Sequence, residues 1–267
     1  MRIHSLANQT DLIFPRFDGF VHDHGDHLAI LTPDNPTFYW GNFLLFARPP
    51  EAGDFARWMS LFEAEIAQPS GARHVTFGWD SIGGESGQVD EFLAAGFTLQ
   101  ESVVLATSQV QRPPRYNTQV SVRPLRAEWE WQAAIENQVE CRGEDHDRPG
   151  YLIFKRNQFR RYQAMTAAGL GEWFGAFLGD QLVADLGVYR SERLGRFQSV
   201  CTHPDYRRQG ICGALVHQAA RHALDVMQLE RLVMVADEHY HAARIYESAG
   251  FTPCEKQRGL ERWPGKG

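Results

Sequence analysis

The sequence has few cysteines, no long apolar run and no surplus of positive charge, and each shortage excludes a class of protein. Its 267 residues include four cysteines with no CxxC pair and no short disulfide pattern, so we expect reduced thiols. No stretch approaches the roughly 18 apolar residues of a membrane-spanning helix, and the first residues lack the apolar core of a secretory signal. A net charge of −6 argues against a general nucleic-acid binder. We expect a cytoplasmic protein without nucleic-acid or membrane partners, whose oligomeric state stays open.

A proline-containing stretch near the middle divides the chain into two halves. Residues 111–117 contain two adjacent prolines, which suit neither a helix interior nor a central strand. The string Ala-Gly-Phe-Thr ends both halves, at 95–98 and at 249–252, each time after a helical pattern. Glycine there suits the left-handed end of a helix. We therefore predict two domains, 1–112 and 118–267, and the repeat favours a duplication.

Hydrophobic periodicity predicts strands and helices in both halves. The first half is expected to have strands at 27–32, 37–46, 75–79 and 98–106 and helices at 54–68 and 89–95. The second is expected to have strands at 119–123, 173–178, 182–189, 196–202 and 232–236 and helices at 128–141, 151–168 and 209–225. Strands and helices mixed with hairpins predict an α+β fold.

The most informative segment, 200–215, has the pattern of a strand, a tight basic loop and a helix. Arg207 and Arg208 precede Gly210 and Gly213, which allow a backbone to approach a ligand closely. A helix N-terminus offers unpaired N–H groups and a partial positive charge, so this loop suits a pyrophosphate. The arginines would add charge-assisted hydrogen bonds. The alternative is an ordinary strand-to-helix turn with exposed arginines.

Two segments of the second half resemble the GNAT (Gcn5-related) N-acetyltransferases. Arg207, Gly210 and Cys212 follow the family's acyl-CoA-binding pattern Arg/Gln-x-x-Gly-x-Gly/Ala, with Cys212 at the second glycine position. Residues 239–251 are similar to the pattern Asn-x-x-Ala-x-x-x-Tyr-x-x-x-Gly-Phe, with His239 in place of Asn. The resemblance covers roughly 120 to the C-terminus. It implies the GNAT fold, a mixed and mostly antiparallel sheet flanked by helices, in two tandem halves.

The resemblance also implies a reaction, the direct transfer of an acetyl group from acetyl-CoA to a primary amine of a small molecule or peptide. Tyr246 matches the tyrosine that family members often use as general acid for the departing CoA thiolate, the alternative being a core tyrosine. The expected acetyl-CoA contacts are Val200, Cys201, Thr202, Arg207, Arg208, Gln209, Gly210, Ile211, Cys212, Gly213, Ala214 and His239. In the first three, backbone groups would pair with the pantetheine arm, and one N–H would polarise the thioester carbonyl.

The general base stays unassigned. Glu144, Glu172 and Asp185 are candidates, although each also fits a surface carboxylate. In the first half, residues 47–53 lack the glycine pattern before the helix at 54–68, and Phe92 stands where the second half has Tyr246. We therefore interpret the first half as a degenerate copy that shapes the structure or the substrate site and has no acyl-CoA site of its own.

Two other functions remain open. The string His22, His24, Asp26 and His27 resembles the metal-binding motif of metallo-β-lactamase-fold hydrolases, which would make the protein a metal-dependent hydrolase. The family's following glycines are missing and a strand begins at once, so a charged turn is the simpler interpretation, and we expect no metal. The other function is a non-catalytic acyl-CoA-binding or protein-interaction module.

One helix of the second half carries a cluster of cations. Lys155, Arg156, Arg160 and Arg161 are expected to form a single basic face on the helix 151–168. Solvation of this face is the default interpretation, with an acidic substrate or partner as the alternative.

Overall fold

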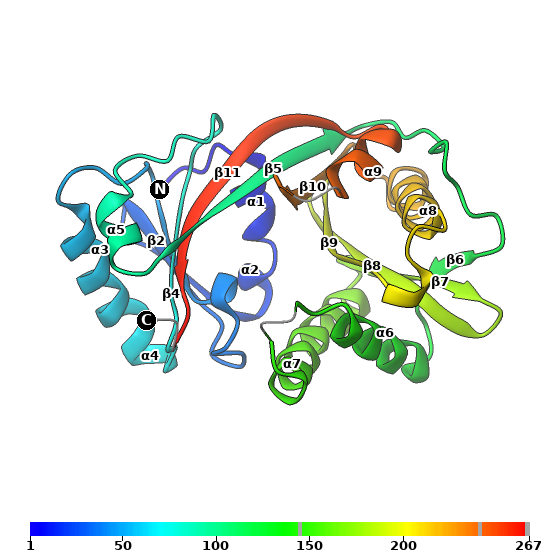
Figure 1. The fold of residues 1–267 in the computed structure, drawn as a ribbon, viewed down its shortest axis with the longest axis horizontal. Helices are drawn as coiled ribbons and strands as arrows, with labels where there is room; N and C mark the ends of the chain where they lie inside the picture. The colour runs from blue at the N-terminus through cyan, green and yellow to red at the C-terminus, as the bar shows by residue number, and fades with distance from the viewer. Residues whose placement is uncertain (144–145, 240–241, 265–267) are drawn as a thin grey trace. The chain divides into compact units, whose positions relative to one another are not determined.

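The computed structural model describes residues 1–143, 146–239 and 242–264, and the chain forms two compact units (Figure 1). The first contains Met1–Val104, Asp237–His239 and Glu255–Gly267, and the second Leu105–Ala236 and Tyr240–Cys254. Within the described ranges, no helix is both long and apolar enough to cross a membrane.

The first unit is built on a mixed sheet. Its elements are α1 (Leu6–Asp11), α2 (Pro15–Asp18), β1 (Phe20–Asp23), β2 (His27–Leu31), the 3-10 turn η1 (Tyr39–Gly41), β3 (Phe43–Phe46), α3 (Asp54–Phe62), the π-helical η2 (Glu63–Ala67), α4 (Gln68–Ser70), β4 (Val75–Trp79), α5 (Asp90–Ala94), most of β5 (Thr98–Thr107) and most of β11 (Thr252–Arg262). The strands β1, β2, β3, β4 and β11 are neighbours in that order. The β3–β4 pair is parallel, whereas the other pairs in this series are antiparallel.

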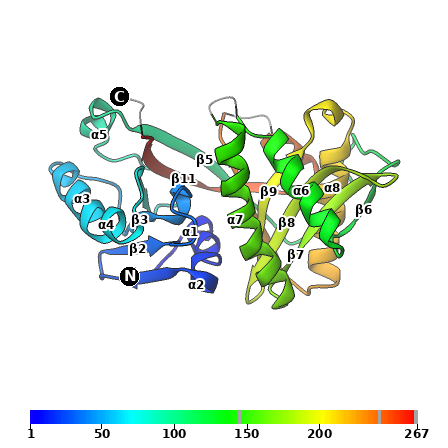
Figure 2. The same ribbon diagram turned by 90° about the horizontal axis from the view of Figure 1, so that it is seen from below.

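Both faces of this sheet are covered, which explains why β2, β3 and β4 are buried at every position and mostly apolar. Alternate residues of a strand point to opposite faces, and in β2 Ala29 and Leu31 join the aromatic core under α3, including Trp58 and Phe77. Leu28 and Ile30 join a second core with Leu12. In Figures 1 and 2, α3, α4 and α5 cover one face and α1 and α2 the other. Such double coverage removes the polar alternation by which a strand is usually recognised.

The expected strand at 37–46 is shorter in the structure. Residues Tyr39–Gly41 form η1, and only Phe43–Phe46 form a strand. The buried amide of Asn42 holds the preceding turn, because its Oδ1 accepts a hydrogen bond from the Thr32 N–H and its Nδ2 donates to the carbonyls of Asn35 and Phe38. A side chain that bonds to local backbone in this way competes with strand formation.

The second unit has a sheet in the order β10, β9, β8, β7 and β6. Its elements are β6 (Ser121–Pro124), α6 (Glu128–Glu140), α7 (Arg148–Ala167), β7 (Gly171–Leu178), β8 (Gln181–Ser191), β9 (Leu194–Thr202), the 3-10 turn η3 (Pro204–Tyr206), α8 (Ile211–Asp225), β10 (Arg231–Asp237) and α9 (Ala242–Ser248). All pairs are antiparallel except β9–β10. Helices α6 and α7 lie on one face of the sheet and α8 on the other (Figures 1 and 2). The mixed, mostly antiparallel α+β architecture predicted from the sequence is confirmed.

The two units have the same order of elements. Three strands, a helix, a strand, a helix and a strand follow one another as β1-β2-β3-α3-β4-α5-β5 and as β7-β8-β9-α8-β10-α9-β11. In both series the third strand pairs antiparallel with the second and parallel with the fourth. The helix between them starts after a left-handed glycine, Gly53 with φ 86° and Gly210 with φ 76°. This order supports the duplication that the sequence repeat favoured.

The structure divides the chain differently from the expected boundaries of 1–112 and 118–267. The first unit ends its continuous stretch at Val104, and the chain returns to this unit at Asp237–His239 and from Glu255 onward. The reason is the pairing of β11 with β4, in which Gly259 lies opposite Gly78 and Arg262 opposite Val75. The last strand of the sequence thus completes the sheet of the first unit.

Candidate active site

Strand β9 carries a bulge near its carboxyl end. Asp185 of β8 lies opposite Cys201, and Gly187 lies opposite Gln198, so two residues of β9 face one residue of β8. The first of these two, Ser199, has the unusual φ of 51° for a residue with a side chain. A β-bulge bends its strand and redirects the groups that follow. Here the redirected residues are Val200, Cys201 and Thr202, which the sequence predicted as contacts of the pantetheine arm.

On its other edge, β9 separates from β10 before the bulge. The parallel pairing with β10 joins only Leu194–Arg196 to Arg231–Val233. Beyond these three pairs, the described residues of β9 have no register with β10, although both strands continue, to Thr202 and Asp237. Two parallel strands that diverge at their carboxyl ends leave backbone N–H and C=O groups without a strand partner. An extended, amide-bearing ligand can pair with such groups.

A basic loop joins this end of β9 to α8. Arg208 and Gly210 both have positive φ, 61° and 76°, and α8 begins at Ile211. Left-handed residues just before a helix can turn backbone N–H groups to one side, an arrangement that suits an anion. The side chains of Arg207, Arg208 and Gln209 are exposed, whereas Ile211 and Ala214 are buried. The latter two could therefore meet a ligand only through their backbone.

The predicted boundary segment packs against this loop, which the sequence analysis did not foresee. Asn117 donates a hydrogen bond from its N–H to the Gly210 carbonyl and from Nδ2 to the Gln209 carbonyl, at 3.2 and 3.0 Å. Arg115 donates to the Arg208 carbonyl. These contacts hold the loop's carbonyl groups. A β-carbon at Gly210 would lie 3.0 Å from the Asn117 nitrogen, so glycine is required there for the close approach as well as for its φ.

A buried carboxyl group lies behind the bulge. Asp185 is 0% exposed and accepts hydrogen bonds from Asn137 Nδ2, Gln138 Nε2 and Trp173 Nε1, at 2.5, 2.7 and 3.0 Å. Burial raises the pKa of Asp185 to about 7, although the three donors and Lys155 act to lower it. Gln138 Nε2 also donates to the Ser199 carbonyl at 2.7 Å. The carboxyl group thus positions the bulge through Gln138.

The three candidate bases of the sequence analysis have different surroundings. The interpretation of Asp185 as a surface carboxylate is wrong, because α6, β7 and β8 enclose it. Glu172 forms an ion pair with Arg126, with hydrogen bonds of 2.7 and 3.0 Å. Glu144 lies outside the described residues. No base is assigned from these positions.

A disulfide bond joins β9 to the helix α6 in the structure. Cys141, at the end of α6, forms a disulfide with Cys201 of β9, and their Cα atoms are 6.4 Å apart. The prediction of reduced thiols is therefore wrong for this pair. The two cysteines are distant in the sequence, so their spacing gave no sign of the bond; only the packing of α6 against the sheet brings them together.

The predicted basic face of α7 is also divided by the fold. Arg156 and Arg160 are exposed, whereas Lys155 and Arg161 are only 4% and 6% exposed. Burial lowers the pKa of Lys155 to about 8, against the opposing charge of Asp185. The prediction of a single solvated face is wrong, because one side of α7 packs against α6 and β7.

A separate pocket of about 730 Å³ lies at the other end of β10. Its lining includes Glu230 and Arg231 before and at the start of β10, with Glu247 of α9 and Gln109 and Gln111 after β5. None of the expected acetyl-CoA contacts lines this pocket, so it is distinct from the opening between the ends of β9 and β10.

The comparisons with known proteins agree with this geometry. Residues 170–253 match the family model described as an acetyltransferase (GNAT) domain. The second unit carries a GNAT domain. A search of curated proteins finds no match.

Solved structures similar to the whole chain include further GNAT proteins. A GCN5-related N-acetyltransferase from Kribbella flavida is 14% identical, with a TM-score of 0.64 over 98% of this chain and 96% of that one. A functionally unknown conserved protein from Staphylococcus epidermidis is 12% identical, with a TM-score of 0.72 over 92% and 94%. A tandem GNAT protein from the clavulanic acid biosynthesis pathway is 12% identical, with a TM-score of 0.54 over 82% and 73%. At these identities the likeness shows the GNAT fold alone.

In the GNAT domain, the remaining predicted site residues differ in their placement. Tyr246 is 6% exposed on α9, which packs against α8. Cys212 lies half-buried in the first turn of α8, where burial raises the pKa of its thiol to about 11. The thiol therefore stays neutral and puts no negative charge beside an incoming phosphate.

His239 and the loop residues belong to different units. His239 belongs to the first unit, where its Nε2 contacts Glu101 Oε2 at 3.0 Å and its N–H donates to Asp237 Oδ1 at 2.7 Å. The pKa of His239 is raised, chiefly by its hydrogen bond to Glu101. An ion pair of this kind favours a structural role over contact with a cofactor.

The first unit has a different group at the place that corresponds to the GNAT phosphate loop. Asp54 opens α3 directly after Gly53, and its Oδ2 accepts hydrogen bonds from the Glu51 N–H and from Arg48, at 2.9 and 2.8 Å. Burial acts to raise the pKa of Asp54, but these donors lower it overall. The carboxylate therefore occupies the start of α3 as an anion would. This supports the interpretation of the first half as a copy without its own acyl-CoA site.

Proposed function

We propose that the GNAT domain transfers an acetyl group from acetyl-CoA directly to a primary amine of a small molecule or peptide. The observation that carries the proposal is the divergence of β9 and β10 beside the basic loop. It brings an unpaired, bulged strand edge and an anion-binding helix start to one end of one sheet.

Acetyl-CoA would be held in two parts. Its pyrophosphate would lie on the N–H groups of residues 209–214, with Arg207 and Arg208 adding charge-assisted hydrogen bonds. Its pantetheine arm would pair with the backbone of Val200, Cys201 and Thr202. One of these N–H groups would then donate to the thioester oxygen and stabilise the negative charge that develops there.

The reaction would proceed through attack of the neutral amine on the thioester carbon. A C–N bond forms, the C–S bond breaks, and the electron pair leaves with sulfur. Tyr246 would supply a proton to the thiolate, while the amine releases its proton to water. Most of the acceleration would come from holding the two reactants together.

The first test is calorimetric titration of the purified protein with acetyl-CoA. We expect micromolar binding by the wild type and a loss of about 10-fold or more in Arg207→Glu/Arg208→Glu, because each charge-assisted hydrogen bond contributes about 1.5–3 kcal/mol. Both arginines are exposed, so the fold should persist. The matched control is Arg156→Glu/Arg160→Glu on α7, which makes the same change of charge at exposed positions and should bind normally.

Turnover with a panel of amines separates the enzyme from the binding module. An enzyme should show lower kcat in Tyr246→Phe with an unchanged Kd for acetyl-CoA. Binding without turnover of any amine would favour the non-catalytic acyl-CoA-binding module. Failure of the folded wild type to bind acetyl-CoA would contradict both.

A further inference from the structure

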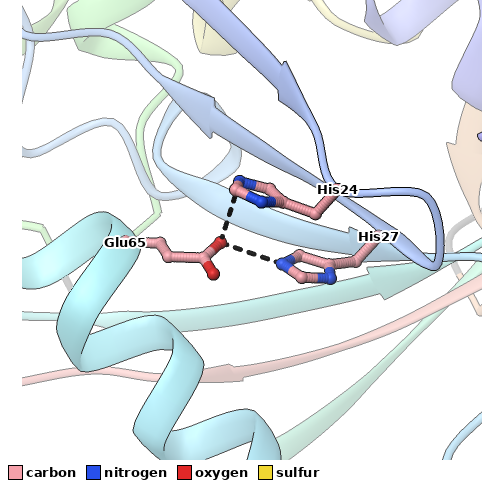
Figure 3. Close-up of side chains that lie close together, drawn as sticks. All are labelled: His24, His27 and Glu65. Atoms are coloured by element: carbon pink, nitrogen blue, oxygen red, sulfur yellow. Dashed lines mark hydrogen bonds and ion pairs between the residues drawn. The ribbon is translucent and has the colours of Figure 1, made fainter.

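Three side chains of the first unit converge at the turn between β1 and β2. His24 lies in the turn, His27 begins β2, and Glu65 lies in the π-helical segment η2. In Figure 3 both imidazole rings face the Glu65 carboxylate and lie nearly parallel to each other. Their centroids are 4.8 Å apart. Short π-helical insertions often occur where a helix must aim a functional side chain.

The spacing of these groups suits a divalent cation. Glu65 Oε2 is 2.9 Å from His27 Nε2 and 3.5 Å from His24 Nε2. One ligand atom from each of the three residues lies within 4.8 Å of the others. Ligands bound to zinc at about 2.0–2.1 Å in a tetrahedron are separated by about 3.3 Å. Small side-chain adjustments would therefore complete the site.

Each ring nitrogen of His27 faces a carboxylate group. His27 is 4% exposed, and its Nδ1 is 2.7 Å from Asp26 Oδ1, while its Nε2 faces Glu65. A neutral imidazole has one N–H, so it cannot donate to two carboxylates. If Nδ1 donates to Asp26, the Nε2 lone pair faces a carboxylate oxygen, and a cation between them would satisfy both.

The surroundings match those of a metal-binding histidine. Such a histidine donates its second ring N–H to a carboxylate that fixes its orientation, as Asp26 is placed to accept. Arg57 forms an ion pair with the other Asp26 oxygen and holds that carboxylate in position. His24 has a side chain 43% exposed, so one side of the site is open to solvent for entry and for a water ligand.

We propose that His24, His27 and Glu65 bind one Zn²⁺, with Asp26 as a positioning residue and a water in the fourth place. Two imidazoles and a carboxylate form a donor set that suits zinc. The bound ion would join the β1–β2 turn to the helical segment that follows α3 and so stabilise the first unit. This inference does not depend on the transferase function.

The structure also corrects our expectation of no metal and the motif that the sequence analysis kept as an alternative. That motif contained His22, His24, Asp26 and His27 as ligands. His22 instead stacks on Phe20 on the exposed strand β1. Asp26 contacts Nδ1 of His27, the ring nitrogen on the side away from Glu65. Glu65 replaces them, and no local spacing could have identified it.

The test uses tag-free, metal-stripped protein titrated with ZnCl₂ by calorimetry, with Tm measured at each ratio. We expect one Zn²⁺ per chain and a rise in Tm for the wild type. His24→Ala and Glu65→Gln change side chains that are partly exposed, so both should fold, and both should lose the binding and the rise. Asp26→Asn should weaken binding by about 10–100-fold.

The matched control is His22→Ala, which removes a histidine of the same turn from outside the cluster and should bind zinc as the wild type does. Absorption of Co²⁺-loaded protein in the visible range should report a tetrahedral site in the wild type and in this control. Equal loss of zinc in His22→Ala would overturn the proposal. So would a wild type that binds no zinc, or unchanged binding in Glu65→Gln.

Discussion

The protein environment of Asp185 sets the protonation state of its carboxyl group. Burial raises the pKa of Asp185 from 3.8 to about 7. Between these two pH values the carboxyl group is protonated in the folded protein and ionised in the unfolded chain. Stability from this group is therefore complete below about pH 4 and is lost as the pH rises through about 7.

We expect the free energy of unfolding of the wild type to fall by a few kcal/mol relative to Asp185→Asn between pH 4 and pH 7.5, since each pKa unit corresponds to about 1.4 kcal/mol. Urea titrations across this range measure the difference, in which the contributions of other groups cancel. Lys155→Met removes a cation that lowers the pKa of Asp185, so it should move the loss to higher pH. Parallel curves for wild type and Asp185→Asn would show that Asp185 does not titrate there.

The same residue shows why sequence reasoning stopped short at this scale. The residue type of an aspartate in a strand does not show whether its carboxyl group faces water or three N–H donors. The donors come from α6 and β7, so only the assembled fold reveals the burial. Glu65 was absent from the candidate metal ligands for the same reason, whereas His24 and His27 were among them because they share one short turn.

At the scale of elements, the start of α8 depends on glycine conformation. We expect Gly210→Ala to weaken acetyl-CoA binding and to reduce stability by about 1–2 kcal/mol, because an alanine there is strained at φ 76° and crowds Asn117. Calorimetry and chemical unfolding measure the two effects. Gly179→Ala is the matched control: Gly179 also has positive φ, 59°, but a β-carbon there meets nothing within 4 Å. It should lose stability alone, and equal loss of binding in both variants would contradict the argument.

Elements with strong local patterns were predictable. The helix expected at 54–68 corresponds to α3, η2 and α4, because Trp58, Phe62 and Ile66 form one apolar stripe. The strands expected at 173–178 and 182–189 correspond to β7 and β8, which pair across the turn at Gly179. The short elements α1, α2 and β1 were missed because four to six residues carry too little periodicity. The sequence predicted the strand, loop and helix at 200–215 from its residues, and the structure has them. The divergence of β9 and β10 could not be predicted in this way, because it depends on how the strands pair.

At the scale of the whole molecule, the first unit requires β11. We expect a fragment of residues 1–112 to lack a cooperative unfolding transition, because β4 loses one of its two partner strands and the core loses Leu260, which is 0% exposed. Joining residues 252–264 to this fragment through a flexible linker should restore the transition, measured by circular dichroism during urea unfolding. The same fusion with Leu260→Asp is the control and should fail. Cooperative unfolding of the bare fragment would show that β11 is dispensable.

The pairing of Val75 with Arg262 also has a consequence for protein synthesis. A ribosome makes β4 early and β11 after nearly all of the second unit, so the first unit cannot close its sheet until β11 has been made. The second unit takes most of its residues from one continuous stretch and can fold sooner. A frameshift or premature stop after β10 would therefore damage the part of the protein that was translated first.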